Sequence, residues 1–288
     1  MTITIAHLGP PGTYTEQAAI FYLNQLTKST GVEAILCPYP SISQTLAAVD
    51  ANSAQLAVVP VENSIEGSVT MTLDTLWLLN NLQIHMGLVM PIAHMLVSCA
   101  ASLEDIKIVY SHPQALSQCQ GWLEQFLPTV ELIPSKSTTE ALLELQQNLT
   151  TAAISSQRAA QLYNLPILAS GINDYPENFT RFWVVSQTHK AFTLQTDFKK
   201  ASYSSLAFSL PANLPGALVK ALQVFAHLDI NLSRIESRPT KRSLGEYLFF
   251  IDAEADVSEP QMQSALAELS ERTELLKIFG SYNVLQFT

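Results

Sequence analysis

Strand-forming segments alternate with capped helical segments in the first part of the chain, and this alternation restricts the folds open to it. Residues 2–8, 34–38 and 56–61 have the composition of strands, and each leads through a loop rich in Gly, Pro, Ser or Thr into a helix-forming stretch. A second group of such units follows, and the chain then returns to a strand over residues 181–187. We therefore expect two α/β lobes with a cleft between them, which several helix N-termini face.

Polar residues gather where the third predicted strand ends. The loop contains Asn63, Ser64, Gly67 and Ser68 and precedes a helix. Open α/β sheets bind their ligands at such strand ends. An Asn-Ser sequence is often only a turn, but the number of hydrogen-bond donors makes a ligand-binding loop at least an equal alternative.

The first strand ends in a Gly/Pro-rich turn that begins a helix. Thr13 or Thr15, on either side of Tyr14, can cap that helix, and the free backbone N–H groups at its start suit an anion. The alternative is an ordinary turn, because the glycine spacing matches neither a P-loop nor a dinucleotide-binding fingerprint.

A later helix begins at Pro113, with Ser111 as its expected cap and with Gln114 and Gln118 on one face. The adjacent His112 has the chemistry of an acid or base. A single histidine at a helix start is more often a hydrogen-bonded structural residue, and we favour that interpretation for its imidazole.

A hydroxyl and a guanidinium lie between two aromatic rings in the sequence Asn178-Phe179-Thr180-Arg181-Phe182. Taken alone, an arginine in an apolar segment is usually structural, and a threonine there is usually an ordinary strand residue. This stretch, however, falls where the chain crosses back between the two predicted lobes. That position favours a functional role for the Thr-Arg pair, with the aromatic rings directing both side chains towards a substrate.

The pattern changes after a polar segment at residues 188–202, which reads as a linker. Strands are predicted at residues 205–210, 230–237, 247–253 and 275–279, and helices at residues 214–227 and 259–272. This β-α-β-β-α-β order is the ferredoxin-like arrangement. We expect a small sensor domain without catalytic residues, which pairs with a second copy.

Composition excludes several classes of protein. The 288 residues include 48% hydrophobic and 14% charged residues, with a net charge of −10, so there is no basic surface for nucleic acid. The three cysteines are far apart and contain no C-x-x-C, which argues against a disulfide framework or a zinc site. Neither a signal peptide nor a membrane-spanning segment is evident, so we expect a cytoplasmic protein.

Together these segments resemble the prephenate dehydratase family, and the resemblance covers essentially the whole chain. It rests on the turn at residues 9–15, the loop at residues 60–69, Ser111-His112-Pro113-Gln114 with Gln118, and the stretch at residues 178–182. The C-terminal part resembles an ACT domain. The resemblance implies a two-lobed, periplasmic-binding-protein-like catalytic domain at residues 1–187, with lobe one at about 1–82 and 179–187 and lobe two at about 83–178, a linker at 188–202 and an ACT domain at 203–288.

The resemblance also implies a reaction and a site. Prephenate would lose CO2 and its ring hydroxyl without a metal or organic cofactor, and Thr180 would donate to the departing hydroxyl. Arg181 would clamp a carboxylate, while Asn63, Ser64, Ser111 and Gln118 would bind the remaining oxygens. Further substrate-binding residues would be Thr13, Tyr14, Thr15, Gly67, Ser68, His112 and Phe182.

Feedback control by L-phenylalanine is implied by the same resemblance, as is a homodimer or homotetramer built through ACT domains. The effector-binding residues would be Gly216, Ala217, Leu218, Val219, Asn231, Leu232, Glu236, Ser237, Arg238 and Pro239. Two small departures from the family pattern, Tyr203-Ser204-Ser205 and Asn283, concern only effector binding. Arogenate dehydratase is the alternative reaction, and a non-enzymatic amino-acid-binding sensor is the alternative class.

Overall fold

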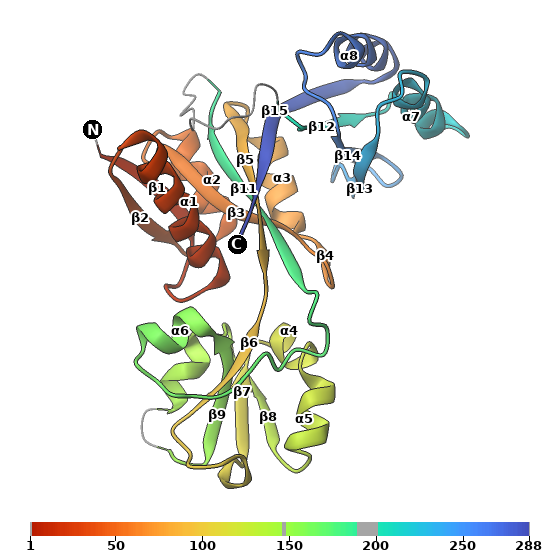
Figure 1. Cartoon of the computed structure of the whole chain (residues 1–288). Coiled ribbons are helices and arrows are strands. Elements are labelled where there is room, and N and C mark those ends of the chain that lie inside the picture. Colours follow the sequence, from red (N-terminus) through yellow and green to blue (C-terminus); the bar gives the residue numbers. More distant parts are fainter. Residues whose placement is uncertain (1, 146–147, 189–200, 288) are drawn as a thin grey trace.

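A computed structural model describes residues 2–145, 148–188 and 201–287 of the chain. Within these residues the strands form a ten-stranded sheet in the order β13-β14-β12-β15-β5-β11-β3-β1-β2, with β4 beside β3, and a five-stranded sheet in the order β10-β6-β9-β7-β8. Figure 1 shows the smaller sheet with its helices at one end of the molecule and the C-terminal domain at the other. The α/β fold class expected from the sequence is therefore confirmed.

Lobe one is built from a mixed sheet between helices. Its strands are β1 (Ile3–Leu8), β2 (Ala34–Tyr39), β3 (Leu56–Asn63), β4 (Gly67–Ser68), β5 (Leu82–Pro91) and β11 (Phe179–Gln187), and its helices are α1 (Tyr14–Thr30), α2 (Ile42–Asp50) and α3 (Thr70–Leu78). Apolar residues of α1 pack on one face of the sheet, and those of α2 and α3 pack on the other. Strand β11 lies between β3 and β5 and is antiparallel to both.

Lobe two is a separate sheet that the chain enters after β5 and leaves before β11. It contains β6 (His94–Ser98), β7 (Ile108–Ser111), β8 (Glu131–Pro134), β9 (Thr151–Ser156) and β10 (Ile167–Ser170), with α4 (Pro113–Ser117), α5 (Gln120–Phe126), α6 (Gln157–Leu162) and the 3-10 turns η1 (Leu103–Asp105) and η2 (Glu140–Leu145). Two apolar clusters cover it. The two crossings between the lobes, residues 91–94 and 170–179, bring the strand ends of both lobes together.

The C-terminal domain has the predicted β-α-β-β-α-β order. Its elements are β12 (Tyr203–Ser209), α7 (Ala217–His227), β13 (Leu232–Pro239), β14 (Tyr247–Ala253), α8 (Pro260–Arg272) and β15 (Leu275–Gln286). Both helices pack on one face of its sheet. Strand β15 pairs first with β12 and then, at residues 283–286, with β5 of lobe one. The C-terminal sheet is thus continuous with the sheet that carries β11.

Several sequence predictions need correction. The last strand runs to Gln286 rather than residue 279, because the chain passes through Gly280 in a left-handed conformation (φ +115°) and pairs again with a new neighbour. Residues 141–147 have the composition of a helix, but the structure forms the 3-10 turn η2 there, and residues 146–147 lie outside the described residues. Strand β10 was not predicted. The predicted linker falls mostly on residues 189–200, which the structure does not describe.

Candidate active site

Thr180 and Asn63 form the centre of the candidate site. They are directly opposed where β11 begins and β3 ends, and Asn63 Nδ2 donates to Thr180 Oγ1 at 3.0 Å. Asn63 Oδ1 accepts the backbone N–H groups of Ile65 and Glu66 at 3.0 and 3.1 Å, which fixes the orientation of the amide. Among the described residues Asn63 is the one hydrogen-bond partner of Thr180 Oγ1. The Thr180 hydroxyl is therefore an acceptor from Asn63 and keeps its own proton available, and its residue is 8% exposed.

A buried asparagine at the second crossing joins this pair to lobe two. Asn178 has no exposed surface, and its Oδ1 accepts from Asn63 Nδ2 at 2.8 Å and from Ser64 Oγ at 3.4 Å. Asn178 Nδ2 donates to Gln118 Oε1 at 3.1 Å. Ser64 Oγ also accepts the N–H of Phe179 at 2.9 Å. Asn63, Ser64 and Gln118, predicted from separate loops, are thus brought together around Asn178.

The chain of hydrogen bonds continues through His94. Gln118 Oε1 lies 2.9 Å from His94 Nε2, and His94 Nδ1 lies 2.9 Å from the Tyr14 hydroxyl. Since the amide oxygen of Gln118 accepts, we assign the imidazole proton to Nε2. Burial lowers the pKa of His94 from its ordinary value, and the Gln118 hydrogen bond offsets this only in part, so the ring is neutral at pH 7. Gln118 Nε2 also donates to Glu66 Oε1 at 3.3 Å, which ties the lobes a second time.

The N-terminal turn forms another contact between the lobes. Thr13 caps α1 through its Oγ1, which accepts from Glu16 N at 3.3 Å, while Gly12 N donates to Glu16 Oε2 at 2.6 Å. Ser156 Oγ of lobe two donates to Gly12 O at 2.8 Å, and Arg158 Nε lies 3.7 Å from Glu16 Oε2. The Gly12 N–H, one of the backbone donors expected to bind an anion here, is therefore occupied by a carboxylate of the protein. Thr15, the second residue of α1, is buried.

Three predicted site residues have other structural partners. Ser111 Oγ has no exposed surface and donates to Ile154 O at 2.7 Å, so it stabilises the sheet of lobe two. His112 Nδ1 accepts from Gln114 N and caps α4, as the structural interpretation of its ring expects. Phe182 is 1% exposed within the core beside α1, and the contact of its ring with the substrate stays a prediction.

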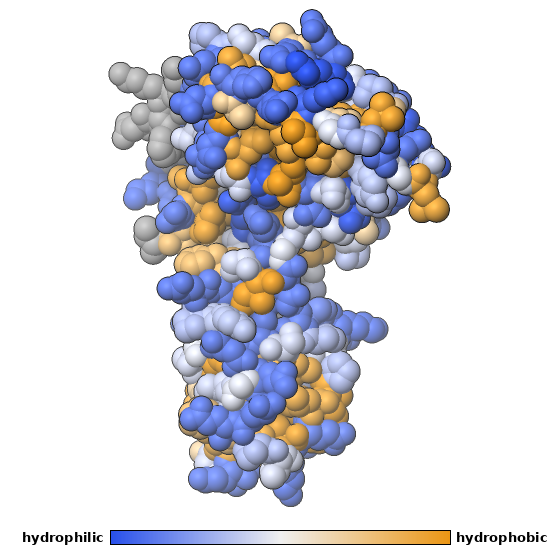
Figure 2. Space-filling model, turned by 90° about the vertical axis from the view of Figure 1, so that its right-hand side faces the viewer, coloured by the Kyte–Doolittle hydropathy of each residue, from blue (hydrophilic) through white to orange (hydrophobic). Residues whose placement is uncertain are grey.

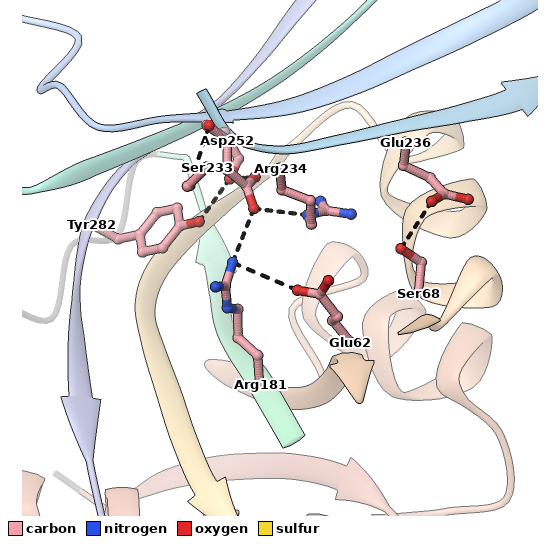
Figure 3. A network of polar contacts seen from close by, with 9 residues as sticks. Glu62, Ser68, Arg181, Ser233, Arg234, Glu236, Asp252 and Tyr282 are labelled. Atoms are coloured by element: carbon pink, nitrogen blue, oxygen red, sulfur yellow. Dashed lines mark hydrogen bonds and ion pairs between the residues drawn. The ribbon is translucent and has the colours of Figure 1, made fainter. Parts of the chain in front are cut away.

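Arg181 does not share a face with Thr180. Successive strand residues point to opposite sides of a sheet, whereas the interpretation of the sequence has both side chains facing one ligand. Arg181 Nη1 lies 3.3 Å from Oδ2 of the buried Asp252 on β14 and 3.8 Å from Glu62 Oε2 (Figure 3). Its guanidinium is directed to the C-terminal domain.

Two of the predicted effector-binding residues, Glu236 and Arg238, contact lobe one. Gly67 and Ser68 form the short strand β4, and Ser68 Oγ donates to Glu236 Oε2 on β13 at 3.1 Å (Figure 3). Arg238 donates from Nε and Nη2 to the two carboxylate oxygens of Asp74 on α3, at 3.2 and 3.1 Å. The remaining predicted effector residues lie at the start of α7 and in β13 with the loop before it: Gly216 (φ +79°), Ala217, Leu218, Val219, Asn231, Leu232, Ser237 and Pro239.

Sequence reasoning assigned no role to two central members of the network, Asn178 and His94. Asn178 stands in the quoted Thr-Arg stretch, and its position next to the strand was the available indication. His94 follows the first crossing at the end of an apolar run, which gave no indication of its partners. In the described parts of the chain no group of three or more His, Cys, Asp or Glu side chains could hold a metal ion, and no helix could cross a membrane.

Comparisons of the sequence with known proteins point to one family. The family model described as Prephenate dehydratase matches residues 5–190, and the ACT domain model matches residues 204–271. A bifunctional chorismate mutase/prephenate dehydratase from Aquifex aeolicus is 40% identical over 282 residues, which cover 97% of this chain and 73% of that protein. A prephenate dehydratase from Lactococcus lactis subsp. lactis is 36% identical over 283 residues, 97% of each chain.

A solved structure has the same overall fold. The prephenate dehydratase of Arthrobacter aurescens in complex with L-Phe superimposes with a TM-score of 0.85 at 35% identity, over 98% of this chain and 90% of that one. The matched family model, the alignments along nearly the whole chain and the shared fold lead to one assignment. The chain belongs to the prephenate dehydratase family of hydro-lyases and carries a C-terminal ACT domain.

Proposed function

We propose that this protein converts prephenate to phenylpyruvate, CO2 and water, with Thr180 as the hydrogen-bond donor to the departing hydroxyl. One observation carries the role of Thr180: its Oγ1 accepts from Asn63 Nδ2, so its own proton is free to point to a ligand. The exposed Ser64 and Phe179 beside it leave the site open to solvent at this edge.

The reaction needs little more than positioning and one proton. The bond between the ring and its carboxylate breaks, and that electron pair forms a ring double bond as CO2 leaves. The C–O bond to the ring hydroxyl breaks in the same process, and the hydroxyl takes a proton and departs as water. Aromatisation of the ring supplies the driving force. The protein must hold the dianion and deliver the proton.

Asn63 compensates for the weak acidity of a threonine hydroxyl. Its N–H donation to Oγ1 stabilises negative charge on that oxygen as the proton moves to the leaving group. Thr180 then regains a proton from solvent. A positioned proton donor contributes about 10²–10⁴-fold, and orientation of the substrate contributes at least as much.

The remaining members of the proposed site differ in their support. Ser64 lies at the exposed edge of the network and Gln118 has an amide group in it, and both stay in the proposal as substrate donors. The Tyr14 hydroxyl contacts His94 Nδ1, so any effect of Tyr14 on the substrate passes through His94. Ser111 is better described as a structural residue, because its hydroxyl already donates to Ile154 O.

L-phenylalanine is the proposed effector of the ACT domain, and the solved structure of the Arthrobacter aurescens relative is a complex with L-Phe. The division into a catalytic part at residues 1–187 and a regulatory part at residues 203–288 belongs to this proposal, as does a cytoplasmic location. Assembly into a homodimer or homotetramer is supported by the exposed apolar residues of this domain, which include Val219, Ile235 and Tyr247. Figure 2 shows apolar side chains in patches on both the upper and the lower part of this face.

Phenylpyruvate formation from prephenate tests the proposed reaction, and arogenate as a parallel substrate tests the alternative. Thr180→Val removes the hydroxyl with little change in shape and is expected to lower kcat at least about a hundredfold, as is Thr180→Ala. Thr180→Ser keeps the hydroxyl and is the matched control, expected within about tenfold of the wild type. A Thr180→Val enzyme that folds and turns over near the normal rate would contradict the assignment.

A further inference from the structure

The strands that carry Asn63 and Thr180 present an ion-pair network on their opposite face (Figure 3). Arg181 and Glu62 oppose each other in the ladder, one residue along from the Thr180–Asn63 pair, with Arg181 Nη1 3.8 Å from Glu62 Oε2. The same nitrogen lies 3.3 Å from Asp252 Oδ2 in the ACT domain. Asp252 has no exposed surface, and a buried carboxylate of this kind requires its partner charges. At this point the contact between lobe one and the ACT domain therefore depends on the Arg181–Asp252 ion pair.

Asp252 is held firmly from within the ACT domain. Its Oδ2 accepts from Arg234 Nε at 2.8 Å, and its Oδ1 accepts from Ser205 Oγ at 2.5 Å. The Arg234 guanidinium carbon lies 5.5 Å from the ring centre of Trp183, two residues beyond Arg181 on β11. Strands β12, β13 and β14 thus converge, through side chains, on the start of β11.

The backbone ladder is irregular at this place. The pairing of β11 with β3 shifts register between Arg181 and Phe182, where Pro60 is the partner of Phe182 and lacks an N–H group. A bulge and a missing donor weaken the main-chain restraint on residues 180 and 181. Side-chain contacts therefore contribute more than usual to their position.

A second contact attaches the opposing strand. Ser68 on β4 pairs with Glu62 in the ladder, and Ser68 Oγ donates to Glu236 Oε2 at 3.1 Å. Glu236 is on β13, the same strand as Arg234. The ACT domain accordingly holds both sides of the Thr180–Asn63 pair through neighbouring strands of one sheet.

We propose that the Asp252–Arg181 ion pair positions Thr180 against Asn63 and transmits the state of the ACT domain to that pair. Arg181 is then a positioning residue that does not touch the substrate. A shift of β13 displaces Arg234 and Asp252, and Arg181 carries the displacement to β11, where the 3.0 Å contact between Asn63 and Thr180 changes. This inference rests on the proposed roles of Thr180 and of L-phenylalanine.

The test uses Arg181→Met in the full-length chain, which leaves Asp252 paired with Arg234. Steady-state kinetics with prephenate and calorimetric titration of L-phenylalanine are measured on the same preparations. We expect kcat to fall at least about tenfold while KM and the Kd for L-phenylalanine stay within about threefold. The change in turnover caused by L-phenylalanine, about 5–150-fold for typical coupling, is expected to drop below about twofold.

Arg181→Lys separates positioning from substrate binding. A lysine keeps one ion pair with Asp252 but not the fork that grips a carboxylate, so it should restore part of the L-phenylalanine effect. Arg272→Met, on the exposed end of α8, is the matched control and should behave as the wild type. If Arg181→Met does not fold, the kinetics and the L-phenylalanine effect of Arg181→Lys alone test the inference.

Two results overturn the inference. One is a KM raised at least about tenfold in either Arg181 variant with an unchanged L-phenylalanine effect, which identifies a substrate clamp. The other is a full L-phenylalanine effect in Arg181→Met, which identifies a static anchor. A wild-type protein that neither converts prephenate nor binds L-phenylalanine would instead contradict the proposed function, so the two failures are distinguishable.

Discussion

Asn63 Nδ2 lies 3.0 Å from Thr180 Oγ1, and the other end of the same amide accepts two backbone N–H groups. The amide therefore cannot turn over without breaking both backbone hydrogen bonds. The Thr180 oxygen faces a donor, and its own proton is not committed to Asn63. The turn after β3 thus determines the polarity of the hydroxyl that we propose to be catalytic.

Asn63→Asp should reverse that polarity. A carboxylate at this position can keep the backbone hydrogen bonds but accepts from Thr180, which commits the hydroxyl proton to the protein. We expect kcat to fall at least about a hundredfold, the same size of loss as removal of a positioned donor. The hydrogen bond from Asn63 Nδ2 to Asn178 Oδ1 is lost as well, so the free energy of unfolding is measured on the same preparation. Initial rates of phenylpyruvate formation measure the change.

The exposed Asn24 on α1 offers the matched control, because Asn24→Asp introduces the same charge far from Thr180. It should leave kcat within about twofold. An Asn63→Asp enzyme as active as Asn24→Asp would show that the amide has no part in proton delivery.

Asn178 should matter for both stability and rate. It is buried and bonds to Asn63 and Gln118, so Asn178→Ala removes one hydrogen bond from the Asn63 amide nitrogen and one from the Gln118 amide oxygen, which keep Thr180 and His94 as partners. Each lost hydrogen bond costs about 0.5–1.5 kcal/mol. We expect the unfolding free energy in urea to fall by about 1–3 kcal/mol and kcat to fall with it. A loss under about 0.5 kcal/mol, typical of surface changes, would show that the network is not structural.

Sequence reasoning reached the architecture because strand and helix periodicities are local properties. It selected Asn63, Thr180 and Gln118, which the structure joins through Asn178. It did not identify the partner of Arg181, because strand alternation directs this side chain away from Thr180 and Asp252 is 71 residues away in the chain. No local pattern identifies such a partner.

Dependence on residues distant in the chain also explains two other features that the sequence did not predict. The second half of β15 pairs with β5 only after the chain passes through Gly280, so its strand character depends on a distant neighbour. His94 takes its role from Tyr14 and Gln118, which come from different lobes. Tertiary contacts, not sequence pattern, define these features.

His94 should make folding stability dependent on pH below its ordinary pKa of 6.5. Burial lowers the pKa of the folded state, so between 6.5 and that lower value the unfolded chain binds a proton that the folded chain does not. The unfolding free energy should therefore fall as the pH drops through this range, by at most about 1.36 kcal/mol per pH unit from this group.

Urea unfolding at pH 7.5 and 5.0 checks this expectation. His94→Gln removes the titrating group and should show a smaller loss at the lower pH than the wild type. His227→Gln, at the exposed end of α7, is the control and should keep the wild-type loss. Equal losses in His94→Gln and wild type would show that the ring is not held neutral.

Gly12→Ala should change the spacing of the two lobes, and with it KM, more than it lowers the free energy of unfolding. Gly12 has φ +89°, and a Cβ there would lie 2.7 Å from Thr139 Cγ2 and 3.1 Å from Ala159 Cβ of lobe two. The contact of Gly12 O with Ser156 Oγ would be displaced at the same time. We expect KM for prephenate to rise at least about fivefold, because misplacement of one lobe by a fraction of an ångström disturbs substrate orientation.

Gly31→Ala is the matched control for backbone strain alone. Gly31 has φ +69°, and no atom lies within 4 Å of its added Cβ. Both variants should lose about 1–2 kcal/mol of unfolding free energy from the left-handed conformation, but only Gly12→Ala should raise KM. Equal KM values in the two variants would show that the turn before α1 does not set the distance between the lobes.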